Sequence, residues 1–146
     1  MYIVSSCLLG ENVKYSGGNN YHQGVVDFLE DKDVFPICPE VVGGLPVPRI
    51  PCERLGDKVI NKQGVDLTAA FHEGARRCWE TIVHDWSPED IEGAILKARS
   101  PSCGAGVIYD GTFTGVKIQG DGVFAELLKS KGVKVMTELD FEIDEV

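Results

Sequence analysis

The sequence has no run of lysine and arginine residues, and no hydrophobic stretch near the roughly 20 residues that a membrane-spanning helix needs. Its 146 residues include 14 Lys and Arg against 23 Asp and Glu, which gives a formal net charge of −9. Because non-specific affinity for nucleic acid comes from cationic patches, we expect neither a nucleic-acid partner nor a membrane partner. Free nucleobases and nucleosides remain compatible ligands, since they carry little or no phosphate charge.

The amino-terminal segment also lacks the features of a signal peptide. "MYIVSSCLLGENVKY" has no basic n-region and no long apolar h-region, so it is expected to form a first strand of the mature protein. We therefore expect a cytoplasmic protein, in which thiols stay reduced. The five cysteines are an odd number without a CxxC pair, which fits neither a disulfide framework nor the usual structural zinc site. The thiols are expected to be ligands, nucleophiles or core residues.

Segments of strand and helix character alternate along the chain. No linker, repeat or low-complexity tract divides them, and the length fits a single domain over residues 1–146. The alternation predicts an α/β fold, a three-layer Rossmann-like domain with a mainly parallel sheet, followed by an exposed acidic tail. The predicted strands are 2–6, 33–37, 92–97 and 133–138, and the predicted helices are 20–31, 67–84 and 121–132.

The helix over 67–84 has the clearest pattern, because its apolar residues recur at spacings of three and four. Asp66 is its expected N-cap. Cys78 falls on the apolar face of this helix, where we expect it to be a small buried core residue.

Two other segments have weaker patterns. Residues 39–65 contain four prolines and little periodicity, which predicts an ordered loop at a functional site. The pair Asp110-Gly111, between apolar or β-branched residues, predicts a hairpin with a two-residue turn.

Three cysteines follow predicted strands at the point where the chain leaves the core. Cys7 follows the strand over 2–6, Cys38 the strand over 33–37, and Cys103 a short turn after the strand over 92–97. Ligands of open parallel sheets bind beyond the carboxyl ends of the strands, so we expect the three thiols to meet there. Soft sulfur ligands suit zinc or iron–sulfur clusters, and three of them leave one metal position open. From spacing alone, a shared metal site and buried packing residues are both compatible with the sequence.

Cys52, in "RIPCERL", has two interpretations. It is either a bystander in the segment 39–65 or a fourth ligand of the same site. A fourth cysteine would close the site and favour electron transfer or a structural role over chemistry.

Groups suited to activating water lie close to two of these thiols. Glu40 follows Cys38 by two residues. Ser100 lies three residues before Cys103, and Ser102 is directly before it. A carboxylate beside a metal can act as a general base, and a hydroxyl can orient the water. Taken singly, Glu40 is equally typical of a helix cap, and the serines are typical of a turn around a proline. Arg49, between prolines, is a candidate to bind a substrate carbonyl or anion, or to pair with a carboxylate.

Four motifs together resemble the thiouracil desulfidase family. They are "SCLLG", "CPEVVGGLPVPRIPCE", "KARSPSCGAGVIYDGTFTG" and "GDGVFAELL", and they follow the family's order along nearly the whole chain. The resemblance implies a 4Fe-4S cluster bound by Cys7, Cys38 and Cys103, whose fourth iron captures the thiocarbonyl sulfur of the substrate. It also implies that Glu40 activates, and Ser100 positions, the water that replaces this sulfur.

The activity implied by the resemblance is an iron–sulfur-dependent, hydrolase-type conversion of C=S to C=O. The substrate would be a thiolated nucleobase or nucleoside such as thiouracil, with Arg49 and Ser102 as substrate-binding candidates. No electron source is required, since the cluster acts as a Lewis acid and hydrosulfide leaves onto its iron. The alternatives are a thiol-redox or sulfur-carrier protein, and a non-catalytic module that binds a metal or a cluster. The sequence does not indicate an oligomeric state.

Overall fold

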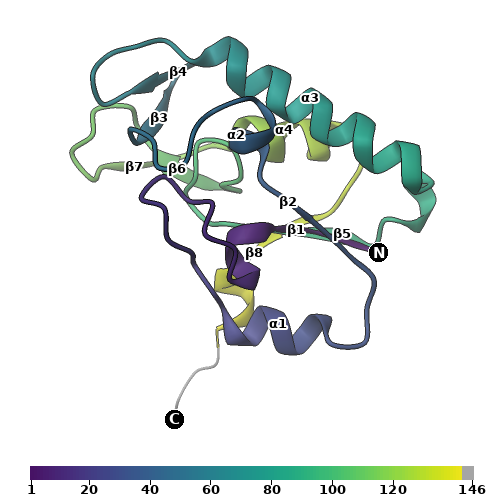
Figure 1. Ribbon diagram of the computed structural model, residues 1–146. Helices are drawn as coiled ribbons and strands as arrows, with labels where there is room; N and C mark the ends of the chain where they lie inside the picture. The colour runs from purple at the N-terminus through teal and green to yellow at the C-terminus, as the bar shows by residue number, and fades with distance from the viewer. Residues whose placement is uncertain (143–146) are drawn as a thin grey trace.

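A parallel sheet of four strands lies in the middle of the molecule. The computed structural model describes residues 1–142 (Figure 1). The strand order is β2-β1-β5-β8, and every pairing in this sheet is parallel. The strands are β1 (Tyr2–Ser5), β2 (Val34–Ile37), β5 (Gly93–Leu96) and β8 (Val135–Thr137). Each lies inside one of the four predicted strands, so the prediction of a parallel sheet is confirmed.

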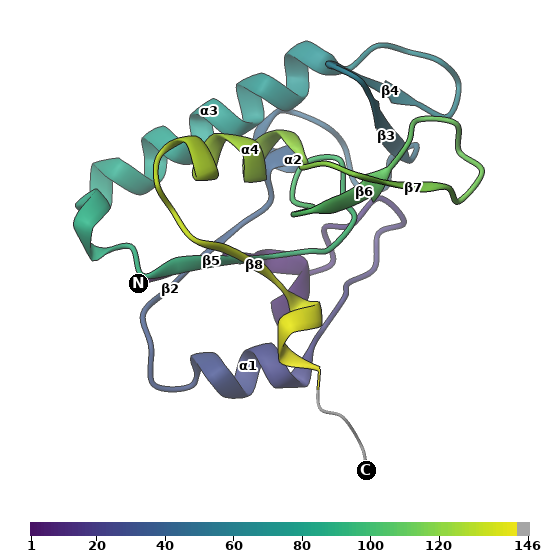
Figure 2. The ribbon, with the colours of Figure 1, turned by 180° about the vertical axis from the view of Figure 1, so that it is seen from behind.

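Helices cover both faces of this sheet. Helix α1 (Gln23–Leu29) lies against one face, and α3 (Thr68–Asp85) and α4 (Val123–Ser130) lie together over the other (Figures 1 and 2). The three-layer α/β arrangement expected from the alternating pattern is therefore confirmed.

Both faces of the central strands are buried, as their continuous apolar sequences require. Ile3 packs in the cluster shared with Phe71 of α3 and Phe124 of α4, whereas the next residue, Val4, packs in the cluster shared with Val25 of α1. Successive side chains of a strand point to opposite faces, so one short strand joins the two halves of the core.

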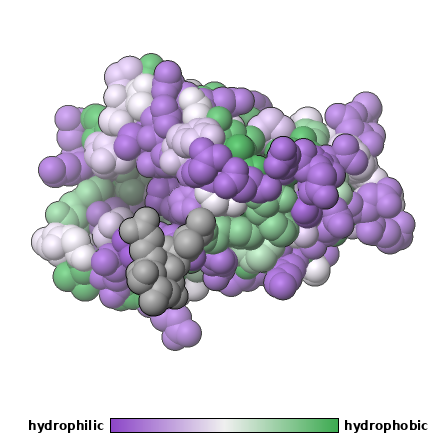
Figure 3. Space-filling view, turned by 90° about the horizontal axis from the view of Figure 1, so that it is seen from below, coloured by the Kyte–Doolittle hydropathy of each residue, from purple (hydrophilic) through white to green (hydrophobic). Residues whose placement is uncertain are grey.

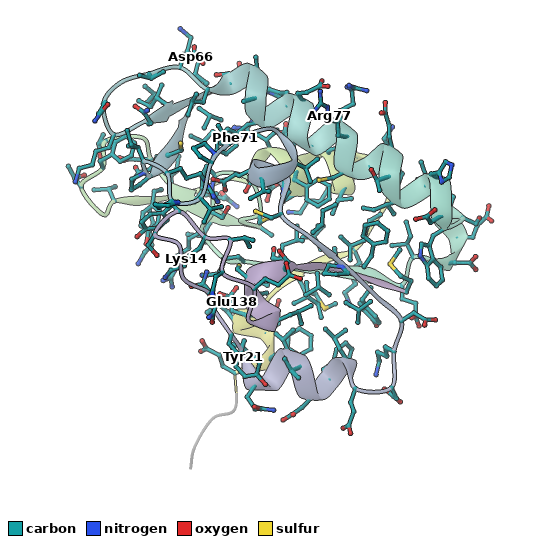
Figure 4. All side chains as sticks on the ribbon, viewed as in Figure 1. Lys14, Tyr21, Asp66, Phe71, Arg77 and Glu138 are labelled. Atoms are coloured by element: carbon teal, nitrogen blue, oxygen red, sulfur yellow. The ribbon has the colours of Figure 1, made fainter. Side chains whose placement is uncertain are left out.

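The apolar face predicted for the long helix is the buried face of α3. Phe71 points toward the sheet and Arg77 points away from it (Figure 4). Cys78 lies on the same face as Phe71 and is fully buried, which confirms its expected place in the core. The predicted cap is displaced by one residue, because the N-cap is Leu67. Asp66 still binds the start of the helix, since its Oδ1 accepts a hydrogen bond of 2.9 Å from the Thr68 N–H.

The segment 39–65 contains more regular structure than its sequence pattern predicts. It forms the short helix α2 (Pro39–Val42) and a hairpin of β3 (Cys52–Leu55) and β4 (Lys58–Asn61). The prediction of a loop without periodicity is wrong for these residues. These short elements lack the apolar runs that mark the strands of the central sheet, since β3 reads CERL and β4 reads KVIN, and the prolines around them hide the pattern further.

The hairpin after Cys103 is present, but the predicted two-residue turn is wrong. β6 (Val107–Tyr109) pairs with β7 (Lys117–Gln119), and the loop 110–116 connects them. The Asp110 carboxylate accepts hydrogen bonds from the Thr112 N–H at 3.0 Å and from the Thr112 hydroxyl at 2.6 Å. These bonds turn the chain outward, so the Asp-Gly pair opens a wide loop instead of closing a tight turn.

The remaining described elements are three short 3₁₀ helices, η1 (Ser6–Leu9), η2 (Pro88–Asp90) and η3 (Glu138–Phe141). Within residues 1–142, no helix combines the length and hydrophobicity needed to cross a bilayer. The face that carries α1 is mostly hydrophilic, with smaller hydrophobic areas between the polar ones (Figure 3). The expectation of an exposed acidic tail concerns residues 143–146, which lie outside the described part of the chain.

Two glycines allow α2 to pack directly on α3. A Cβ atom on Gly74 would collide with the carbonyl oxygen of Pro39, and it would lie 3.1 Å from the Cα of Gly43. Backbone therefore meets backbone where α2 crosses α3. This contact fixes the position of the residues at the start of α2, which include Glu40.

We expect Gly74→Ala to destabilise the protein. Alanine in place of glycine normally stabilises a helix interior by about 1 kcal/mol, but here the added methyl group overpacks the contact between α2 and α3. The free energy of unfolding should fall by about 1–3 kcal/mol in a urea titration followed by circular dichroism. His72→Ala, at an exposed position of the same helix, is the control and should change it by less than about 0.5 kcal/mol. Equal or greater stability of Gly74→Ala would contradict the tight contact.

Candidate functional site

Three thiols lie along one cavity at the carboxyl edge of the sheet. Cys7 is in η1, directly after β1, and Cys38 is the N-cap residue of α2, directly after β2. Cys103 lies beyond the end of β5. All three line a cavity of about 550 Å³. The parallel pairing of β1 with β2 and β5 brings them to the same edge, whereas their role as ligands stays a prediction.

The protein environment keeps these thiols protonated. Burial raises the pKa of Cys7, Cys38 and Cys103 above the usual thiol value. The thiols also act on one another, because the charge of Cys38 raises the pKa of Cys7, and both raise that of Cys103. Hydrogen bonds from Asn20 to Cys7 and from Ser5 to Cys103 act in the opposite direction. As thiolates, these three sulfurs would repel one another. A positively charged metal group bound between them would remove this repulsion, and sulfur is a soft ligand suited to such a group.

Within residues 1–142, no three His, Cys, Asp or Glu side chains are close enough together to bind one ion. An iron–sulfur cubane is a larger body than one ion, and its cysteine ligands are correspondingly farther apart. The fit to a cluster therefore rests on the three thiols and on the space between them.

A chain of hydroxyl groups leads from the Cys103 turn to Glu40. The Ser102 hydroxyl donates to Glu40 Oε2 at 2.8 Å, and the Ser100 hydroxyl lies 2.9 Å from that of Ser102. Ser100 Oγ also accepts from the N–H groups of Ser102, at 3.1 Å, and Cys103, at 3.0 Å. With these donors around its oxygen, the Ser100 proton is directed toward Ser102. The chain therefore runs from Ser100 through Ser102 to the carboxylate.

Ser102 has a more central place than its sequence position indicates. It is 2% exposed and stands between Glu40 and Ser100, which do not bond each other directly. As a substrate-binding candidate it was expected to face the ligand, but its hydroxyl is already engaged by two protein partners. The sequence offers one signal for this role, the spacing of Ser100, Ser102 and Cys103. An ordinary turn has the same spacing, so the signal does not single out Ser102.

Arg49 pairs with the other oxygen of the same carboxylate. Its Nε lies 3.1 Å from Glu40 Oε1, and the side chains of the two residues are only 7% and 13% exposed. One of its terminal nitrogens donates to the carbonyl oxygens of Val13, at 2.9 Å, and Pro46, at 3.3 Å. Of the two roles expected for Arg49, the structure shows the pairing with a carboxylate. Glu40 is thus held on both oxygens, by Arg49 and by Ser102.

The cavity carries an excess of positive charge that sequence analysis missed. Among the residues that line it, cationic side chains outnumber carboxylates, although the whole chain has a net charge of −9. The cations are Lys14, Arg49, Lys62, Lys97 and Arg99, and the carboxylates are Glu40 and Glu53. They come from separate segments, so no Lys/Arg run marks them in the sequence. A cavity with this lining attracts electron-rich or anionic groups.

Lys97 is fixed by a buried carboxylate behind the cavity. Its Nζ lies 2.8 Å from Glu138 Oε2, and Glu138 Oε1 accepts a 2.6 Å hydrogen bond from the Ala98 N–H. The positive charge of Lys97 acts to lower the pKa of Cys7. This pair was not expected, since Glu138 lies at the end of the last predicted strand with no motif around it.

The two remaining cysteines, Cys52 and Cys78, differ in whether they line the cavity. Cys52 lines the cavity, and its sulfur is 3.5 Å from the Ile50 carbonyl oxygen. Burial, assisted by the charge of Glu40, raises the pKa of Cys52 to about 11. Cys78 lies on the buried face of α3, in the core, and does not line the cavity.

Comparison with known proteins agrees with this fold. Residues 2–140 match the family model described as 2-thiouracil desulfurase. The chain belongs to this family. Its resemblance to thiouracil desulfidases is thereby confirmed.

Two relatives match over almost their whole length. The chain is 37% identical over 148 residues to the uncharacterized protein YbbK of Bacillus subtilis (strain 168), covering 94% of this chain and 95% of that protein. It is similar to the solved structure of a [4Fe-4S]-dependent thiouracil desulfidase, TudS, with a TM-score of 0.85 and 41% identity. This match covers 95% of the chain and 91% of TudS.

The buried thiol of Cys78 should make stability depend on alkaline pH. Burial raises the pKa of Cys78 from 9.0 to about 12, so between these values the unfolded chain loses a proton that the folded protein keeps. The free energy of unfolding of reduced, metal-free protein should therefore fall as pH rises, by up to about 1.4 kcal/mol per pH unit for this thiol.

In Cys78→Ala the void left by the missing thiol should lower the free energy of unfolding at every pH. The decline of this free energy between about pH 9 and about pH 12 should nevertheless be shallower than in the wild type. Urea titrations across this range measure both slopes, with Thr81→Ala, exposed on the same helix, as the control. Parallel curves for Cys78→Ala and the wild type would contradict the raised pKa.

Proposed function

We propose that the chain is a desulfidase that replaces the thiocarbonyl sulfur of thiouracil, or of a related thiolated nucleobase or nucleoside, with oxygen. The observation that carries the proposal is the meeting of Cys7, Cys38 and Cys103 with Glu40 in one cavity. Membership of the 2-thiouracil desulfurase family supports the substrate class. The similarity to a [4Fe-4S]-dependent thiouracil desulfidase supports the cofactor.

In this proposal Cys7, Cys38 and Cys103 hold a 4Fe-4S cluster. Three cysteine ligands leave one iron with an open position, and such a group supplies a soft Lewis acid for the thiocarbonyl sulfur. The thiols lose their protons when the metal group binds. Lys97 then provides a nearby positive charge that favours the Cys7 thiolate, while its ion-pair partner Glu138 acts in the opposite direction to a smaller extent.

Glu40 is the proposed general base. Arg49 and Ser102 hold its two oxygens, and this fixes the plane of the carboxylate toward the cavity. A water beside it would lose one proton to Glu40 while its oxygen attacks the ring carbon. Ser100, at the outer end of the hydroxyl chain, is the proposed group that positions this water, with Ser102 transmitting its orientation to Glu40.

The reaction balances without electron transfer. The water oxygen forms a bond to the carbon, the carbon–sulfur bond breaks, and the sulfur leaves as hydrosulfide with a proton from the water. The proposed class is therefore hydrolytic, and no reductant is required. The cationic lining of the cavity favours the approach of an electron-rich ring and tolerates the hydrosulfide anion as it leaves.

One observation favours a second candidate function. Cys52 lines the same cavity as the three proposed ligands. If it were a fourth ligand, the open iron position would be closed, and the chain would be a non-catalytic cluster-binding module. The two candidates therefore differ in what Cys52 does.

Cysteine variants separate these candidates. After anaerobic reconstitution, Cys7→Ala, Cys38→Ala and Cys103→Ala should each lose most of the iron and acid-labile sulfide per chain, because one ligand is missing. Cys78→Ala is the matched control and should keep both, and Cys52→Ala should keep both as well if the iron position is open. Loss of the cluster in Cys52→Ala would instead favour the closed module, and a full cluster in any of the first three variants would contradict the ligand set.

Two further variants test the water-activating groups. Glu40→Gln removes the base and Ser100→Ala removes the hydroxyl that positions water, so each should keep the cluster and lower hydrosulfide release from 2-thiouracil by about 10²- to 10⁴-fold. The rate of hydrosulfide release is measured for each variant, and the iron content is determined on the same sample. Glu30→Gln and Ser130→Ala, both exposed and away from the cavity, serve as controls. Full activity in either test variant would remove that residue from the mechanism.

A further inference from the structure

The loop 110–116 forms one wall of the cavity but has no part in the proposed chemistry. It joins β6 to β7, and the Asp110 N–H donates to the Val116 carbonyl at 3.0 Å, which closes its base. Phe113 and Gly115 of this loop line the cavity, as does Tyr109 just before it. Phe113 is half-buried, and it is the aromatic residue of this loop.

The backbone of Phe113 is held in an unfavourable conformation. Its φ of +58° is in the left-handed region, where a bulky side chain is rarely found. The other non-glycine residue of 1–142 in this region is Arg99, with φ of +67°, and it lines the same cavity. Such strain persists only where the surroundings impose it, and it is frequent at ligand-binding sites.

Glu53 imposes this conformation from the opposite hairpin. Its Oε1 accepts hydrogen bonds from the N–H groups of Gly111 and Phe113, both at 3.1 Å. The loop is also pressed against β3, because a Cβ atom on Gly111 would lie 2.8 Å from the Cβ of Leu55. One carboxylate oxygen thus fixes two backbone groups of a loop that is far away in the sequence.

We propose that Phe113 is the surface on which the ring of the substrate stacks, and that Glu53 is the positioning residue that holds it in place. The inference rests on the proposed function, since it requires a planar aromatic substrate. Phe113 has no polar group to direct a reaction, so its contribution is contact with the face of the ring. Stacking of a base on an aromatic side chain contributes equally before and during the reaction, and should therefore appear in KM.

Steady-state kinetics of holoenzyme with 2-thiouracil test the stacking. Wild type is measured first, so that absence of hydrosulfide release would overturn the proposed function together with this inference. With active wild type, Phe113→Leu should raise KM about tenfold with kcat within about twofold, because the ring is lost but the chemistry is not. Phe113→Tyr keeps a ring and should restore KM to within about twofold of wild type. An unchanged KM in Phe113→Leu would overturn the stacking role alone and leave the proposed function standing.

The same assay separates positioning from direct contact at Glu53. Glu53→Ala removes the acceptor and should raise KM, whereas Glu53→Gln keeps an amide oxygen for both N–H groups and should stay within about twofold of wild type. The double variant Glu53→Ala/Phe113→Leu should be no worse than Phe113→Leu, since both changes remove the same contact.

Iron content and the thermal unfolding midpoint are measured on each variant to separate this effect from loss of the cluster or the fold. Equal defects in Glu53→Gln and Glu53→Ala, or additive effects in the double variant, would show that Glu53 acts on the substrate directly and would overturn its positioning role.

Discussion

The parallel pairing of β1 with β2 and β5 is the constraint on which the site depends. Parallel strands end at one edge, and in this chain each of the three is followed by a segment that carries a thiol. β1 and β5 are largely buried on both faces, by α1 on one side and by α3 and α4 on the other. The strand pairing that builds the core therefore also brings the three thiols to one edge.

Glu40 joins the segments that this edge brings together. Arg49 binds it from the segment after α2, and Ser102 binds it from the turn that carries Cys103. A buried ion pair of this kind adds little net stability, because desolvation of both groups offsets their attraction. Removing one partner alone, however, leaves a buried charge without compensation and costs about 3–5 kcal/mol. The arrangement is better explained by the fixed orientation of one carboxylate than by stability.

The sequence predicts the parts of the molecule that have a clear apolar run or apolar spacing. The four strands follow from short apolar runs, α3 and the core position of Cys78 follow from apolar spacing, and a resemblance of four motifs identifies the family. What it does not predict are contacts between distant segments. The pairs Lys97–Glu138 and Glu53–Phe113 join residues about 40 and 60 positions apart, and neither has a local signature. The β3–β4 hairpin escapes prediction because its strands lack an apolar run, and the loop 110–116 because Asp110 bonds Thr112 instead of closing a tight turn.

The whole chain has a negative net charge, whereas the charged residues that line its cavity are mostly cationic. A net charge of −9 opposes non-specific association with polyanions, while the cations that line the cavity attract electron-rich or anionic groups. Burial keeps the cysteine thiols protonated in the absence of metal, so they behave as small apolar groups and the cavity does not carry three thiolate charges. Loss of those protons becomes favourable only when a cationic group is bound. In the proposed cluster site, the positive charge of the metal group would offset the burial that disfavours these thiolates in the free protein.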